Sequence, residues 1–165
     1  MRIALLAIAL VSAAALFGQN RTPLPEQLPV TDVTGASVDL AARNATIRWL
    51  AVYVRLHDHT SDLLLSRIAR NPSLQASAQV AIICDCGNAH DLQQLASRYP
   101  TIDQKSWHAD SRKQVFRSLK LSMMPAMLGI EQGKVAWTFG GAAGTSENTE
   151  SIMTSWIAPS TAQQP

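Results

Sequence analysis

Residues 45–70 read ATIRWLAVYVRLHDHTSDLLLSRIAR, and this stretch decides the predicted fold. Its first ten residues are rich in β-branched and aromatic types and are nearly all apolar, which is typical of a strand buried in the centre of a sheet. From Thr60 onward apolar residues recur at helical spacing, and Asn71-Pro72 is expected to end that helix. The stretch therefore predicts a buried strand, a polar turn and an amphipathic helix.

Strands and helices are predicted to alternate on both sides of this stretch. Strands that alternate with helices favour an α/β fold, with a central mixed β-sheet flanked by helices on both faces. The other predicted elements are a hairpin turning at Thr34-Gly35, a buried strand over 78–85, a helix over 88–100, a short strand within 102–110, a helix over 110–121 capped by Asp110, a hairpin over 125–141 turning at Gln132-Gly133, and a last helix over 145–157.

The first residues, MRIALLAIALVSAAALFGQN, have one arginine, then an apolar run, then small residues. This pattern predicts a signal peptide over 1–18, with an uncleaved membrane anchor as the alternative. Export predicts an oxidising compartment, the bacterial periplasm. Residues 19–27 are interpreted as a linker, 28–157 as one domain and 158–165 as a disordered tail.

The composition limits the classes of partner. The chain has 165 residues and a formal net charge of only +2, and its lysines and arginines are scattered along the sequence. A nucleic-acid-binding protein or a polybasic membrane-binding patch would need a stronger or more clustered positive charge. We therefore predict neither.

Three motifs in this order resemble the thioredoxin-like superfamily. They are the N-terminal hairpin LPVTDVTGASVDLAA (28–42), Met124-Pro125 directly before a strand, and the final hairpin GKVAWTFGG (133–141). The resemblance covers roughly 28–157 and is greatest to TlpA-like periplasmic proteins, including the methylamine-utilisation MauD-like proteins. It implies a thioredoxin-like fold with an N-terminal hairpin, a cis-proline at Pro125, and an activity related to thiol–disulfide exchange.

The chain departs from this superfamily where the chemistry should occur. The resemblance implies a Cys-x-x-Cys motif at the turn between the first central strand and its helix, where the helix N-terminus lowers the pKa of the first thiol. That window falls on His57–Thr60 or on Asp58–Ser61, and neither contains a cysteine. The ordinary dithiol mechanism is therefore not expected here.

The two cysteines, Cys84 and Cys86, support a second hypothesis, a relocated redox pair. Cys84 continues an apolar strand and is expected to be buried, whereas Cys86 is expected to be exposed. A disulfide between them would be strained and easily reduced, because one residue separates the cysteines. Asp85 would raise the pKa of a neighbouring thiol, which weakens this hypothesis.

A third hypothesis is a copper site formed by His57, His59, Cys84 and Cys86, because thiolate and imidazole ligands suit Cu(I). Against it, the histidines are also explained as polar loop residues, and Met123 and Met124 as packing residues. His90 and His108 are interpreted as surface positions. No cofactor is expected unless copper binds.

The function that we predict is non-catalytic, and whether the chain is an enzyme stays open. The thioredoxin-like resemblance implies a groove beside the cis-proline that is similar to a peptide-binding edge, where an extended chain can pair with the backbone. The predicted binding residues are His57, Asp58, His59, Met124 and Pro125. The prediction is an exported accessory or maturation factor for a periplasmic client protein. A divergent oxidoreductase using Cys84 and Cys86 and a copper chaperone remain the alternatives.

Overall fold

The computed structural model describes residues 21–43, 48–141 and 147–158. The predicted signal peptide or membrane anchor over 1–18 lies outside these residues, as does the predicted tail beyond Ala158. Within the described ranges, no helix has the length and apolar character needed to cross a membrane.

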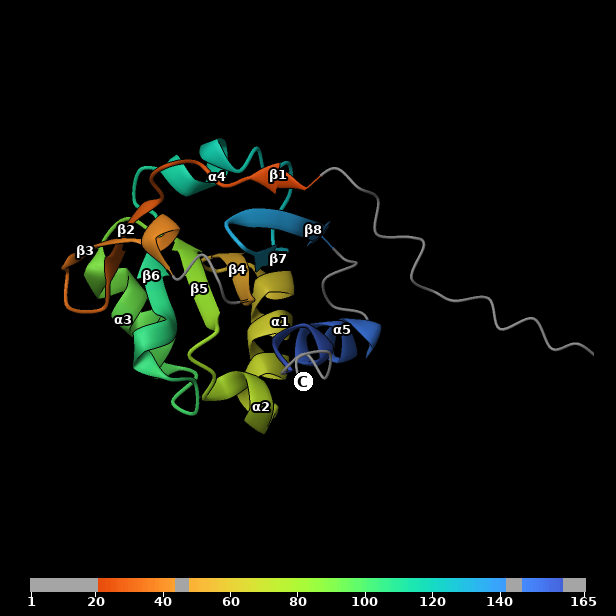
Figure 1. Ribbon diagram of the computed structural model, residues 1–165. Coiled ribbons are helices and arrows are strands. Elements are labelled where there is room, and N and C mark those ends of the chain that lie inside the picture. Colours follow the sequence, from red (N-terminus) through yellow and green to blue (C-terminus); the bar gives the residue numbers. More distant parts are fainter. Residues whose placement is uncertain (1–20, 44–47, 142–146, 159–165) are drawn as a thin grey trace, which may run out of the picture.

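The described residues form one mixed eight-stranded sheet in the order β1-β8-β7-β4-β5-β6-β2-β3 (Figure 1). β4, β5 and β6 pair in parallel, and the other neighbouring strands pair antiparallel. The strands are β1 (Thr22–Pro23), β2 (Pro29–Asp32), β3 (Ser37–Asp39), β4 (Trp49–Arg55), β5 (Val80–Asp85), β6 (Trp107–Ala109), β7 (Ala126–Glu131) and β8 (Lys134–Gly140).

Helices cover both faces of this sheet, which confirms the predicted α/β class. In Figure 1, α1, α2 and α5 lie together on one side of the strands, and α4 lies on the other side. The helices are α1 (His59–Arg70), α2 (Pro72–Gln75), α3 (Ala89–Ser97), α4 (Gln114–Ser118) and α5 (Glu147–Ile157), with 3-10 turns η2 (Leu40–Ala42) and η3 (Gln104–Ser106).

The apolar run of β4 is continuous because each face of the strand packs against a different core. Leu50, Val52 and Val54 join the core beneath α1, α3 and α5. The alternating residues, Ala51 and Tyr53 among them, join a second core with residues of the N-terminal hairpin, η2 and α4. Side chains alternate across a strand, so a strand buried on both faces needs apolar residues at every position.

Both predicted hairpins are present. β2 and β3 pair through the turn at Thr34-Gly35. β7 and β8 pair through Gln132 and Gly133, whose φ angles of 52° and 68° fit the left-handed pair of residues in a two-residue hairpin turn.

Two local features differ from the sequence prediction. The helix expected over 110–121 begins four residues later, because Lys113 has a φ of 53° and breaks the helical path before Gln114. Within the segment interpreted as a linker, Thr22–Pro23 adds a short strand to the edge of the sheet at β8. A strand of two residues is too short to show hydrophobic periodicity, so the sequence pattern did not predict it.

Candidate functional site

The loop between β4 and α1 lies at the carboxyl end of the central parallel strands, where α/β proteins usually carry their functional groups. His57 is exposed and has a φ of 59°, which turns the chain sharply after the strand. Asp58 is the N-cap of α1, and its carboxylate accepts hydrogen bonds from the backbone N–H and the hydroxyl of Ser61, both at 2.7 Å. His59 is the exposed first residue of the helix.

Ser61 is fully buried beneath this loop. Its hydroxyl donates to Asp58 and accepts a 3.1 Å hydrogen bond from the backbone N–H of Arg55. The Asp58 carboxylate also places a negative charge at the positive end of the helix dipole. The Asp58 carboxylate therefore caps the first turn of α1, and the Ser61 hydroxyl links this cap to the end of β4. Neither group can exchange with a disulfide.

Cys84 and Cys86 are free thiols at the end of β5. The prediction that Cys86 is exposed is wrong: only 5% of its surface is accessible, and it packs with Cys84 and Leu92 in the core beneath α3. The Cys86 thiol donates to the Cys84 carbonyl oxygen at 3.6 Å. The pKa of Cys84 is raised well above its ordinary value, mainly by hydrogen bonding to the Cys86 thiol and secondly by burial.

Two basic residues that the sequence analysis did not single out lie beside Asp85 at the end of β5. Asp85 lies between Lys113, at 3.1 Å, and Arg55, at 3.6 Å. The contact with Arg55 follows from the pairing of β4 with β5, and the contact with Lys113 involves a residue in a left-handed turn that local sequence pattern does not indicate.

Asp110 is buried at the same carboxyl end of the parallel strands, and its carboxylate connects several elements there. Its carboxylate accepts hydrogen bonds from the Tyr53 hydroxyl at 2.9 Å and from the backbone N–H groups of Gln114 and Phe116 at 2.7 and 3.1 Å. It therefore holds the start of α4 from four residues ahead of the helix, and not as the predicted N-cap. Burial and the Asp110 charge raise the pKa of Tyr53, so the phenol stays protonated as the donor.

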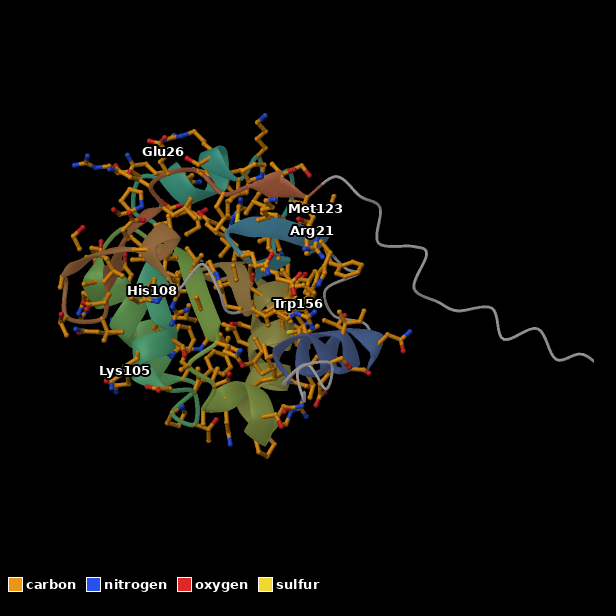
Figure 2. The ribbon with its side chains drawn as sticks, in the orientation of Figure 1. Arg21, Glu26, Lys105, His108, Met123 and Trp156 are labelled. Atoms are coloured by element: carbon orange, nitrogen blue, oxygen red, sulfur yellow. The ribbon has the colours of Figure 1, made fainter. Side chains whose placement is uncertain are left out.

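The Met124–Pro125 peptide bond is cis. The Pro125 carbonyl oxygen accepts a 2.8 Å hydrogen bond from the backbone N–H of Gly141. Met124 packs partly buried against the core that contains Tyr53, whereas 52% of the Met123 surface is exposed (Figure 2). No backbone hydrogen bond joins Ser122, Met123 or Met124 to another described residue.

The two remaining histidines have different environments. His90 is exposed, as predicted, and its ring lies 3.1 Å from the Gln94 amide nitrogen. The surface position predicted for His108 is wrong: 4% of it is exposed, because β2 pairs alongside β6 with Asp32 opposite His108. Neither ring nitrogen has a hydrogen-bond partner among the described residues. Burial, with a smaller effect of the Arg43 charge, lowers the pKa of His108 to about 4.

Comparison with solved structures shows which fold the chain adopts. The chain superposes on a secreted disulfide oxidoreductase of Mycobacterium tuberculosis homologous to E. coli DsbE with a TM-score of 0.59 and 14% identity, covering 80% of this chain and 95% of that one. The chain has a thioredoxin-like fold. A thioredoxin-like protein from Porphyromonas gingivalis (TM-score 0.58, 17% identity, 83% and 92% covered) and a thioredoxin-family thiol:disulfide interchange protein from Chlorobium tepidum TLS (0.62, 11%, 85% and 99%) are also similar. No protein-family model and no curated protein sequence matches the chain.

Within this thioredoxin-like fold, the cap of α1 favours one of the two possible motif registers. A motif whose first residue lies at the helix N-terminus corresponds here to Asp58–Ser61, because Asp58 is the N-cap and α1 begins at His59. The four residues from the N-cap onward are therefore Asp58–Ser61, and none of them has a thiol. Asp58 and Ser61, the first and last of these four residues, contact each other directly through two hydrogen bonds.

The predicted copper cluster does not form in the described part of the chain. Those residues contain no group of three or more histidine, cysteine, aspartate or glutamate side chains able to hold a metal ion. His57 and His59 are exposed on the loop, whereas Cys84 and Cys86 are buried beneath the sheet edge.

Proposed function

We propose that this protein is an exported, non-catalytic member of the thioredoxin-like superfamily that binds an extended segment of a client polypeptide. The observation that carries the proposal is the pair Asp58 and Ser61, which occupies the helix N-terminus of α1 with hydrogen bonds and leaves no thiol there. Dithiol exchange at that helix end would need a thiolate there. The position instead stabilises the loop and presents His57 and His59 to the solvent.

The segment before Pro125 is the surface that we assign to the client. The backbone groups of residues 122–124 form no hydrogen bond to another described residue, so they can pair with an extended chain. Met123 adds an exposed, flexible apolar side chain, which suits a client of variable sequence. We propose that an unfolded polypeptide pairs here and packs an apolar side chain against Met123.

The proposal gives Cys84 and Cys86 a structural role. Both sulfur atoms are buried and so are not accessible to a substrate disulfide, and the raised pKa of Cys84 keeps its thiol protonated. An accessory role in maturing an exported enzyme, as the TlpA-like and MauD-like resemblance suggests, needs only the binding surface.

The test compares client binding with disulfide reduction in the same preparations. Reduced, carboxymethylated α-lactalbumin serves as an unfolded probe, and insulin reduction reports thiol exchange. We expect Met123→Asp to weaken probe binding about tenfold, as loss of a central apolar contact would. The Cys84→Ser/Cys86→Ser variant should bind like the wild type, and neither protein should reduce insulin. Leu63→Asp, which alters the other exposed large apolar residue among those described, is the matched control.

Two outcomes would overturn the proposal. Insulin reduction by the wild type that disappears in Cys86→Ser would show that the buried pair is a redox centre. Probe binding that is unchanged by Met123→Asp would show that the segment before Pro125 is not the client surface.

A further inference from the structure

A groove of about 710 Å³ lies between β8 and α5, with Arg48 and Arg21 at its border. Arg48 directly precedes β4, whereas the loop with Asp58 follows that strand. The groove is therefore at the opposite end of the sheet from the candidate client surface. Figure 2 shows Arg21 and Trp156 on the same side of the molecule, near β8 and α5. The volume of the groove falls within the range of about 300–1,000 Å³ that is typical of small-molecule sites.

The wall of the groove is apolar and held in place. The Trp156 indole N–H donates a 3.0 Å hydrogen bond to the Trp49 carbonyl oxygen, which fixes the ring. Trp137 meets Trp156 edge-to-face, with ring centroids 5.4 Å apart. Ile152 and Ala136, both half-buried, extend the apolar wall. A wall fixed before binding lowers the entropic cost of holding a ligand.

The rim of the groove is positively charged. Arg48 lies 5.0 Å from the centre of the Trp156 ring and pairs with Glu131, which also pairs with Arg21 at 2.9 Å. Lys134 lines the same groove and is exposed, and the ion pairs of the described residues do not include it. Three cations and one carboxylate leave an excess of positive charge beside an apolar wall, with Lys134 available for a further anion.

We propose that this groove binds a medium-chain fatty acid, with its carboxylate at Lys134 and its alkyl chain along Trp137, Trp156 and Ile152. The charge of the rim selects the ligand, because an anion complements the cationic excess and a cation of equal length does not. The apolar wall supplies affinity by removing the chain from water. The inference does not depend on the proposed client surface.

The test uses decanoate, below the concentration at which it forms micelles, with decanol and decyltrimethylammonium as probes of equal chain length. Calorimetry should show saturable decanoate binding, with both other probes weaker by about tenfold. In ¹H–¹⁵N spectra, decanoate should shift the indole resonances of Trp137 and Trp156. It should leave that of Trp107, which lies in the core near α3, unchanged.

Two pairs of variants locate the site. Lys134→Gln should weaken decanoate binding about threefold, as expected for loss of an exposed ion pair, while Lys105→Gln, on the far side in Figure 2, should not change it. Ser155→Phe should fill the groove from an exposed position on α5 and abolish binding. Ser97→Phe, at an exposed position on α3, is its control.

Three results would overturn the proposal. They are the absence of saturable decanoate binding, equal affinity for decyltrimethylammonium, and decanoate binding that survives Ser155→Phe unchanged in a variant whose circular dichroism matches the wild type.

Discussion

Replacing His108 with leucine should make the fold less sensitive to acid. His108 is buried and both ring nitrogens lack partners among the described residues, so the neutral ring is tolerated and the charged ring is not. Its pKa is about 4 in the folded protein, against 6.5 for an unperturbed histidine. Asp32, opposite it on β2, partly offsets the effects of burial and of Arg43.

The direction of the pH dependence follows from which state binds the proton. Below pH 6.5 the unfolded chain protonates His108 while the folded chain does not, so stability falls as the pH falls. The loss grows by about 1.4 kcal/mol per pH unit between the two pKa values and is complete below the folded one. Near pH 5 the wild type should therefore have lost about 2 kcal/mol through this residue alone.

Urea unfolding followed by tryptophan fluorescence, near pH 7.5 and near pH 5, measures this loss. On acidification, the unfolding free energy of the wild type should fall by about 2 kcal/mol more than that of His108→Leu. At the higher pH the variant should be at least as stable as the wild type, because leucine has no unpaired polar atoms to bury. His90→Gln, which alters an exposed histidine, should behave like the wild type. Equal acid sensitivity in His108→Leu and the wild type would refute the reasoning.

Two further substitutions test the elements that position the candidate site and the groove. Asp58→Ala removes both hydrogen bonds to Ser61 and should lower the unfolding free energy by about 1–2 kcal/mol. Asp58→Asn should retain most of the stability that the cap provides. An unchanged urea midpoint in Asp58→Ala would contradict the capping role. Gly129→Ala would place a Cβ 2.2 Å from the Trp137 ring and should cost about 1–3 kcal/mol and shift the Trp137 indole resonance. Gly133→Asn keeps the left-handed turn and is the control. If Gly129→Ala were as stable as Gly133→Asn, the close packing of Trp137 against Gly129 would be contradicted.

Strong periodicity made most of the fold predictable. The buried strands, the amphipathic helices and both hairpin turns follow from local patterns: continuous apolar runs, helical spacing, and residues that tolerate a positive φ. Asp110 shows the limit of such patterns. The sequence marks a capping residue there, but the left-handed turn at Lys113 delays the helix, and the carboxylate is also used by Tyr53 from a distant strand.

The candidate site was only partly predictable, because exposure depends on which elements pack over a residue. The absence of a cysteine between His57 and Ser61 is visible in the sequence and already excludes the ordinary dithiol chemistry there. The sequence could not show that Cys86 is buried: its neighbours Asp85 and Gly87 are typical of exposed loops, and its burial depends on a core formed with residues of other elements, α3 among them.

By itself, then, the sequence determined the order of the longer strands and helices and the absence of thiols at the α1 turn, because both depend on residues that are neighbours along the chain. The tertiary structure alone decided which of these residues meet. It buried His108 by pairing β6 with β2, whose residue Asp32 lies more than seventy positions earlier in the chain, and it joined Arg48, Lys134 and Trp156 around one groove. Burial, shifted pKa values and binding surfaces arise from contacts between distant segments, and local patterns of hydrophobicity and charge do not encode those contacts.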